Sequence, residues 1–174
     1  NENFGVSPDY QLKFQYDVYQ VGNAGGGDEI GIFWDGGTNS QNIFVLNGQK
    51  DESNSFGIVE LLQVNSDFTS FEVAQTFTNP IGTQSLWGYS LSYISDGTTI
   101  AIGSSSTKIV QVWSTTTSNL YTGGTVTNPY TLTATITGLD SSFGRAIAIS
   151  EIDKHILIGD PFYKTDNNNR DQGG

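Results

Sequence analysis

Side chains that commonly transfer protons, attack as nucleophiles or bind transition metals are nearly missing from this chain. His155 is the only histidine, and there is no cysteine. Zinc sites built from thiolates or from several imidazoles are therefore excluded, and imidazole acid–base chemistry would depend on one residue. That residue lies in Asp153-Lys154-His155-Ile156, where a turn leads into a strand. We interpret it as a turn residue and expect no catalysis from this segment.

Neighbouring carboxylates are the second group that could carry chemistry. Asp28-Glu29 and Asp51-Glu52 could act as an acid and a base on a sugar, but both pairs lie in stretches rich in Gly, Asn and Ser, which favours solvated loop charges. Asp166 and Asp171 are the best cation candidates, in an Asn-rich run that also contains Arg170. The run lacks a bidentate Glu and a shaping Gly, so we interpret it as a polar loop and assign no metal or cofactor.

The composition indicates the type of fold that must position such groups. Hydrophobic residues make up 36% of the 174 positions, which suits a folded core rather than a disordered chain. Abundant β-branched and aromatic residues, with Gly, Asn and Asp between them, predict an all-β fold. The formal net charge of −11 repels phosphate backbones and anionic lipids, and no apolar run approaches about 20 residues. We expect neither nucleic-acid binding nor membrane insertion.

An internal repeat organises the second half of the chain. The segment WGYSLSYISDGTTIAIGS (87–104) aligns without a gap on FGRAIAISEIDKHILIGD (143–160), at a constant offset of 56 in the numbering. Each copy reads as a hairpin, and we predict that 89–94 pairs with 99–103 and 145–150 with 155–159. Small and branched residues alternate on these strands, so both faces of each hairpin are expected to be buried.

Two further strands are predicted after each hairpin. KIVQVW (108–113) resembles GIVELL (57–62), and YTLTATI (130–136) resembles FEVAQTF (71–77). A weaker upstream hairpin is predicted from Tyr16–Val21 to Ile30–Phe33. Four strands in each repeat of this length are typical of a propeller blade.

These strands divide the whole chain, 1–174, into about two and a half four-stranded blades. The first covers about 14–77, with an insertion over 38–55 left open because Asn42–Leu46 itself looks like a strand. The second covers about 89–136, and an incomplete third covers 145–174. We expect the last hairpin to leave Ile147, Ile149, Ile156 and Ile158 partly uncovered.

The repeat residues resemble a known motif. Phe143-Gly144 followed by Gly159-Asp160-Pro161 is similar to the paired sequences of FG-GAP repeats, the units of the integrin-α type β-propeller. The middle copy keeps the first half as Trp87-Gly88 and retains Gly103 in the second. Propellers of this family often carry calcium in a long acidic loop, but the turns here, Ser95-Asp96-Gly97 and Glu151-Ile152-Asp153, are too short to supply its ligands.

The resemblance implies a non-catalytic interaction or adhesion domain, extracellular or on a cell surface, that binds a protein or a glycan through its loops. Two alternatives remain open: a structural component of a large assembly such as a virus particle, and an accessory propeller of a larger hydrolase. In each case we expect the rest of the same chain or neighbouring subunits to complete the propeller.

Overall fold

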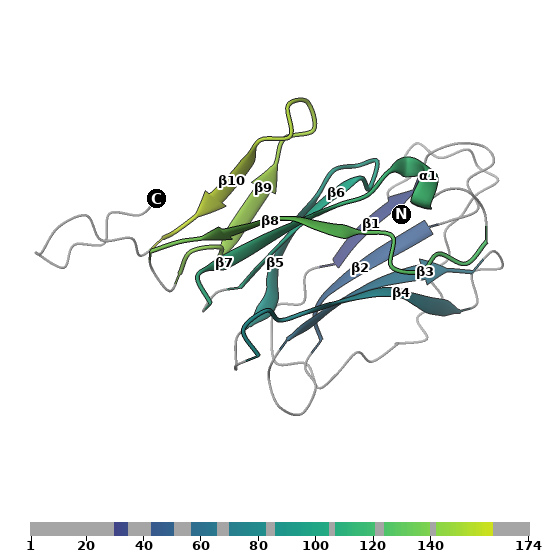
Figure 1. Cartoon of the computed structure of the whole chain (residues 1–174), viewed down its shortest axis with the longest axis horizontal. Coiled ribbons are helices and arrows are strands. Elements are labelled where there is room, and N and C mark those ends of the chain that lie inside the picture. The colour runs from purple at the N-terminus through teal and green to yellow at the C-terminus, as the bar shows by residue number, and fades with distance from the viewer. Residues whose placement is uncertain are drawn as a thin grey trace, which may run out of the picture.

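A computed structural model of the chain describes residues 30–34, 43–50, 57–65, 70–82, 86–104, 107–120, 124–139 and 142–161. In this part of the chain, antiparallel strands form two four-stranded sheets and one two-stranded sheet, and one short helix accompanies them (Figure 1). The prediction of an all-β fold is confirmed at this level.

The first sheet has the strand order β1-β2-β3-β4. Its strands are β1 (Ile30–Trp34), β2 (Ile43–Lys50), β3 (Ile58–Val64) and β4 (Phe71–Thr78). Strand β2 pairs with β1 on one side and β3 on the other, so the segment left open as an insertion contributes a strand of the sheet. The partner that we predicted for 30–33, Tyr16–Val21, lies outside the described residues. The apolar run at the start of β2 explains its place in the sheet, because Phe44 is fully buried.

The second sheet has the order β5-β6-β7-β8, and a hairpin follows it. The strands of the sheet are β5 (Trp87–Tyr93), β6 (Thr99–Ser104), β7 (Ile109–Ser114) and β8 (Thr131–Thr137), with helix α1 (Thr117–Leu120) between β7 and β8. The hairpin consists of β9 (Ala146–Ile149) and β10 (Ile156–Gly159). Leu91 pairs with Ile102 and Ile147 with Ile158, so both predicted hairpins are confirmed.

The two four-stranded sheets share local geometry as well as strand order. Both carry an irregularity between the third and fourth strands, at Leu61/Leu62 in the first sheet and at Val112/Trp113 in the second. Just before the third strand, Gly57 and Lys108 both have positive φ, 67° and 60°. These positions coincide with the sequence similarity between GIVELL and KIVQVW. The similarity therefore reflects a common bulged strand pair.

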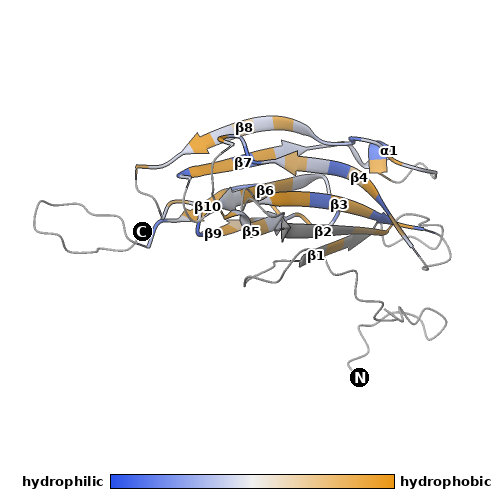
Figure 2. Cartoon of the chain, turned by 90° about the horizontal axis from the view of Figure 1, so that it is seen from below, coloured by the Kyte–Doolittle hydropathy of each residue, from blue (hydrophilic) through white to orange (hydrophobic). Residues whose placement is uncertain are grey.

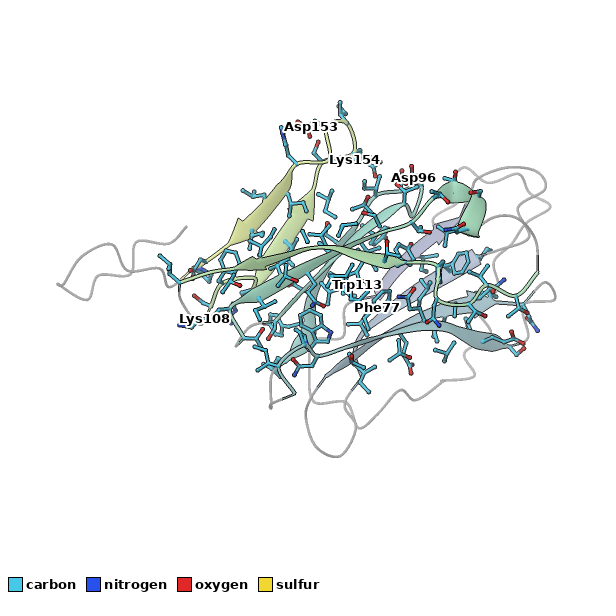
Figure 3. All side chains as sticks on the ribbon, viewed as in Figure 1. Phe77, Asp96, Lys108, Trp113, Asp153 and Lys154 are labelled. Atoms are coloured by element: carbon cyan, nitrogen blue, oxygen red, sulfur yellow. The ribbon has the colours of Figure 1, made fainter. Side chains whose placement is uncertain are left out.

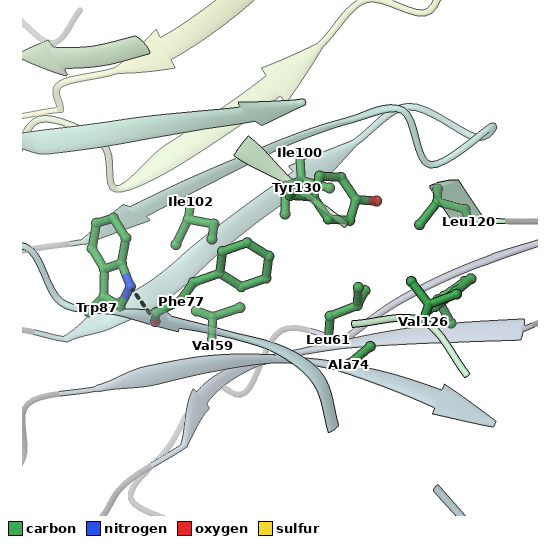
Figure 4. Close-up of a cluster of buried hydrophobic side chains, with 11 residues drawn as sticks. Val59, Leu61, Ala74, Phe77, Trp87, Ile100, Ile102, Leu120, Val126 and Tyr130 are labelled. Atoms are coloured by element: carbon green, nitrogen blue, oxygen red, sulfur yellow. Dashed lines mark hydrogen bonds between the residues drawn. The ribbon is translucent and has the colours of Figure 1, made fainter. Parts of the chain in front are cut away.

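One hydrophobic cluster lies between the two four-stranded sheets. It joins Phe44, Val59, Leu61, Ala74 and Phe77 of the first sheet to Trp87, Ile100 and Ile102 of the second, with Leu120, Val126 and Tyr130 from the α1–β8 segment (Figure 4). The Phe77 ring meets Trp113 and Tyr130 edge to face, with centroids 5.1 and 6.0 Å away. In the view of Figure 2, the strands of the first sheet follow one another from β1 to β4 in the same direction as those of the second sheet from β5 to β8.

A second cluster covers the opposite face of the second sheet. Ala101, Val110 and Val112 are buried there, with Ile136, Phe143, Ile147, Ile149, Ile156 and Ile158 packed around them. Every residue of β6 is buried, so this strand is covered on both faces as predicted. The same prediction is wrong for the terminal hairpin, because no neighbouring strand among the described residues covers Ala146, Ala148 and Leu157, which are exposed. The four isoleucines of the hairpin are only partly buried, in agreement with the expectation. They face the second sheet, however, and the larger exposed surface of the hairpin is on its other side, where Leu157 is 75% exposed.

Candidate functional site

The two halves of the predicted repeat motif meet in the structure. The Gly144 N–H donates to the Gly159 carbonyl at 3.1 Å, and the Ser142 hydroxyl donates to Asp160 Oδ1. Asp160 is only 7% exposed, whereas the following residue, Pro161, is exposed. The Asp160 carboxylate is therefore held inside the fold by a hydroxyl partner, which gives it a structural role in closing the hairpin base.

The middle copy of the motif links the two sheets and the hairpin. Trp87 is fully buried, and its indole Nε1–H donates to the Phe77 carbonyl of the first sheet at 3.2 Å (Figure 4). At Gly103 the hairpin approaches the second sheet closely, because a Cβ there would be 2.5 Å from the Gly144 carbonyl oxygen. A larger residue at 103 would push the hairpin away.

The aromatic–glycine pairs have the same backbone geometry. Gly88 has φ of 82° and Gly144 has φ of 87°, in the left-handed region that favours glycine. Just after each glycine the chain closes the same turn: Tyr89 N–H donates to the Leu86 carbonyl at 3.0 Å, and Arg145 N–H donates to the Ser142 carbonyl at 3.1 Å. The constant offset between the two copies therefore holds for conformation and for hydrogen bonds as well as for residue type.

Two serines of β5, and a third in the turn that follows β5, contact the hairpin. Ser90 Oγ donates to the Gly144 carbonyl at 2.5 Å, and Ser92 Oγ accepts from the Ile149 N–H at 3.0 Å. At the turn, Glu151 accepts from both the N–H and the hydroxyl of Ser95 at 2.9 Å. Sequence reasoning missed these contacts, although Ser95 and Glu151 occupy aligned positions of the two copies, and that alignment was the available signal.

The turns gather at one end of the sheets and form an exposed surface, which we call the turn surface. It comprises Ser95, Asp96 and Thr98 together with residues 115–119 and 151–155, which are exposed or half-buried. The Thr115 N–H donates to the Thr98 carbonyl at 2.9 Å, which connects the second of these segments to the first. Figure 3 places Asp96, Asp153 and Lys154 at this end and Lys108 at the other. The turn surface is therefore a continuous feature built from three separate parts of the chain.

Side-chain caps fix the two hairpin turns of this surface. Asp96 Oδ1 accepts from the N–H and the hydroxyl of Thr98, at 2.8 and 2.7 Å. His155 Nδ1 lies 2.6 Å from Asp153 Oδ2, with the histidine 85% exposed. A hydrogen bond from the Ser150 side chain, followed by the His155 N–H, holds the pKa of Asp153 below its ordinary value of 3.8. The carboxylates thus act as turn caps, and His155 lies in the turn as predicted.

Two buried glutamines, which sequence reasoning also missed, fasten the segment that leads into β8. Gln75 donates to the Tyr130 carbonyl at 3.0 Å and accepts from the Tyr130 N–H at 2.8 Å. Gln63 donates to the Gly124 carbonyl and accepts from the Val126 N–H, both at 2.8 Å. Each side-chain amide thus donates to a backbone carbonyl and accepts from a backbone N–H, as a neighbouring strand would. Nothing in the local sequence pattern marks these glutamines, because their partners are distant in the sequence.

Several predicted positions lie outside the described residues. Among them are the cation candidates Asp166 and Asp171 and the carboxylate pairs Asp28-Glu29 and Asp51-Glu52. Within the described ranges, no group of three or more Asp, Glu or His side chains is arranged to hold a metal ion. No helix among those residues is long and apolar enough to cross a membrane.

In comparisons with known proteins, no family model, no curated protein and no solved structure matches this chain.

Proposed function

We propose that the chain is a section of an FG-GAP-type β-propeller that serves as a non-catalytic interaction domain and binds a protein or a glycan through its turn surface. The observation that carries this proposal is the recurrence of one local geometry at a constant offset along the chain. Gly88 and Gly144 share a left-handed φ, and the same turn hydrogen bond follows each of them. A sandwich has no reason to repeat such details at one spacing, whereas an array of blades does.

The packing of successive units supports the same proposal. The first strand of the second sheet, β5, lies against β1, β2 and β3 of the first sheet, and the first strand of the hairpin, β9, lies against β5 and β6. Each unit thus places its first strand next to the inner strands of the unit before it. Blades arranged around a central axis have this relationship.

The turn surface has the properties of a recognition surface. Its turns are held by side-chain caps, so a ligand would meet a preorganised surface with little ordering cost. Exposed hydroxyls and carboxylates offer hydrogen bonds, and Ile152, which is 95% exposed, offers an apolar contact at the tip of the β9–β10 turn. Loops that project from a rigid scaffold commonly carry binding. We propose an extracellular or cell-surface location for this activity.

A second candidate is a structural component of a large assembly such as a virus particle. The observation that favours it is the exposed apolar side of the terminal hairpin, where Leu157 is largely exposed and Ala146 and Ala148 are exposed beside it. An apolar sheet face of this kind is common at permanent contacts between subunits.

The binding proposal is tested by screening the purified chain against a glycan array and a displayed peptide library. Ile152→Glu, in the turn surface, is expected to weaken any specific binding at least about ten-fold. Leu139→Glu is the matched control, because Leu139 is also an exposed aliphatic residue but lies beside Lys108 at the opposite end. Binding that survives Ile152→Glu and is lost in Leu139→Glu would contradict the assignment of the turn surface. An absence of specific binding in both screens would favour the structural alternative.

A further inference from the structure

The terminal hairpin has two different faces. Ile147, Ile149, Ile156 and Ile158 pack against Ala101, Val110 and Val112 of the second sheet. The opposite face carries Ala146, Ala148 and Leu157, all of them exposed. We call these three residues the outer hairpin face. Ala148 and Leu157 are directly paired across the two strands, so their side chains form one apolar surface.

The corresponding face one repeat earlier is an interface within the chain. The positions aligned with Ala146, Ala148 and Leu157 in the preceding copy are Ser90, Ser92 and Ala101. Ser90 and Ser92 hydrogen bond to the backbone of the hairpin at Gly144 and Ile149. Ala101 is fully buried by that hairpin and its surroundings. The terminal hairpin thus covers the equivalent face of the second sheet. The outer hairpin face is the same kind of face one repeat later, and it is exposed.

We propose that the outer hairpin face binds one further repeat unit of the same kind. Such a unit begins with an aromatic–glycine pair and a hairpin, and it presents branched aliphatic side chains toward Ala146, Ala148 and Leu157. This inference rests on the proposed function, since it assumes that the units form an array, and it names the partner that one surface of the array takes. It continues an interface that the structure already contains.

The residues of this face specify how the incoming unit is held. Alanines stand at 146 and 148 where Ser90 and Ser92 supply hydroxyls in the preceding copy, so the contact is apolar and lacks those two side-chain hydrogen bonds. Leu157 stands where the preceding copy has Ala101. The incoming unit must therefore place a small side chain opposite Leu157, because close-packed interfaces tolerate little excess volume.

A single reporter thiol tests the proposal, because the natural chain has no cysteine. Leu157→Cys introduces a thiol on the outer hairpin face and reduces the side-chain volume toward that of Ala101. In the otherwise unchanged chain, the thiol should react with a maleimide about as fast as one introduced by Ile152→Cys at the exposed turn. Protection of the Leu157→Cys thiol that increases with protein concentration would instead identify a second copy of this chain as the occupant, and would overturn the proposal.

A variant in which a further repeat unit can cover the outer hairpin face is made by repeating one period of the chain. A second copy of the segment 105–160, which is one full period, is inserted directly after Asp160. It supplies two outer strands for the existing hairpin and then another hairpin. We expect the thiol at the first position 157 to react at least about ten-fold more slowly, while a thiol at the first position 152 remains fast. An unchanged rate at 157, in a protein whose circular dichroism has gained strand signal, would overturn the proposal.

A second measurement applies if the extended protein does not fold. In the unextended chain, Leu157→Thr should leave the urea midpoint of unfolding unchanged, because the Leu157 side chain is largely exposed. Ile158→Thr should lower the midpoint, since Ile158 packs against the second sheet. Equal losses for the two variants would mean that the outer hairpin face is packed within the chain, which contradicts the proposal. Neither measurement involves ligand binding by the turn surface, so a failure here is distinct from a failure of the binding proposal.

Discussion

The carboxylate of Glu151 accepts hydrogen bonds from both the backbone N–H and the hydroxyl of Ser95, at 2.9 Å each, and the two residues are 56 positions apart. They are aligned positions of two successive hairpins, so one copy of the repeat caps the turn of the other. The contact connects neighbouring units at the turn surface, on the side away from the aromatic–glycine pairs.

This contact should stabilise the docking of the hairpin on the second sheet. A double-mutant cycle of Glu151→Ala and Ser95→Ala isolates the bond between the hydroxyl and the carboxylate, because Ser95→Ala retains the backbone N–H. We expect a coupling free energy of about 0.5–1 kcal/mol, since this bond is charge-assisted but exposed to solvent. Urea unfolding measures it. The control is the cycle of Glu72→Ala and Thr125→Ala, since the contact between these two side chains is longer, at 3.4 Å. A coupling free energy indistinguishable from zero would show that the contact is incidental.

The aromatic–glycine pair should be intolerant of a side chain at Gly144. Gly144→Ala would force a left-handed φ on alanine and place its Cβ 2.8 Å from Val110 Cγ2, so we expect destabilisation of about 2–4 kcal/mol. Gly82→Ala isolates the backbone effect, because Gly82 has φ of 65° with nothing within 4 Å of its Cβ position. It should cost about 1 kcal/mol. Thermal unfolding compares the two variants, and equal costs would mean that the hairpin does not approach Val110 closely.

The indoles of the buried Trp87 and the half-buried Trp113 should respond differently to replacement by phenylalanine. Trp87→Phe removes the hydrogen bond to the Phe77 carbonyl and leaves a cavity, at a cost of about 2–3 kcal/mol. Trp113 Nε1 is buried with no hydrogen-bond partner among the described residues, so Trp113→Phe also removes an unsatisfied donor and should cost less. Urea unfolding measures the free energies of unfolding of the two variants, and their losses are compared. A larger loss for Trp113→Phe would contradict the packing described for the first cluster.

The glutamine contacts predict a reciprocal pattern of amide exchange. Gln75→Leu should accelerate hydrogen exchange at the Tyr130 amide while the Val126 amide stays protected, and Gln63→Leu should do the reverse. Each variant removes the acceptor of one particular N–H group. Hydrogen exchange followed by NMR resolves the two amides. If both amides lost protection in both variants, the segment would be held as one cooperative unit rather than by individual side chains.

The pKa of Asp153 gives the turn surface a defined response to pH. Because its pKa is lowered in the folded chain, chiefly by the Ser150 side chain, the carboxylate favours the folded turn above its ordinary pKa of 3.8. That contribution disappears as the pH falls through the lower folded value. Ser150→Ala should move the midpoint of the Asp153 carboxyl titration upward toward 3.8, as measured by carbon NMR. A midpoint that does not change in this variant would remove Ser150 as the cause.

The sequence by itself was sufficient to predict the strands of the second sheet and the terminal hairpin. Alternation of small and branched residues, a short Asp-Gly turn and the constant offset between the copies are signals in the sequence, and they predicted the pairing of 89–94 with 99–103 and of 145–150 with 155–159. Upstream, the same reasoning predicted 30–33 as a strand but left 38–55 open as an insertion, whereas in the structure β2 of that segment pairs with β1. A run of apolar residues such as Ile43–Leu46 does not reveal its pairing partner, because that partner is selected by the surface it buries.

Only the tertiary structure decided which faces meet and which polar groups join them. Ser95 and Glu151 are far apart in the sequence, as are Gln75 and Tyr130, and their hydrogen bonds exist only after the units have packed. The exposed outer side of the terminal hairpin was likewise hidden in the sequence, where Ile147 and Leu157 read as equally apolar. Burial is a property of neighbours in space: Ile147 packs against the second sheet, and Leu157 faces away from it.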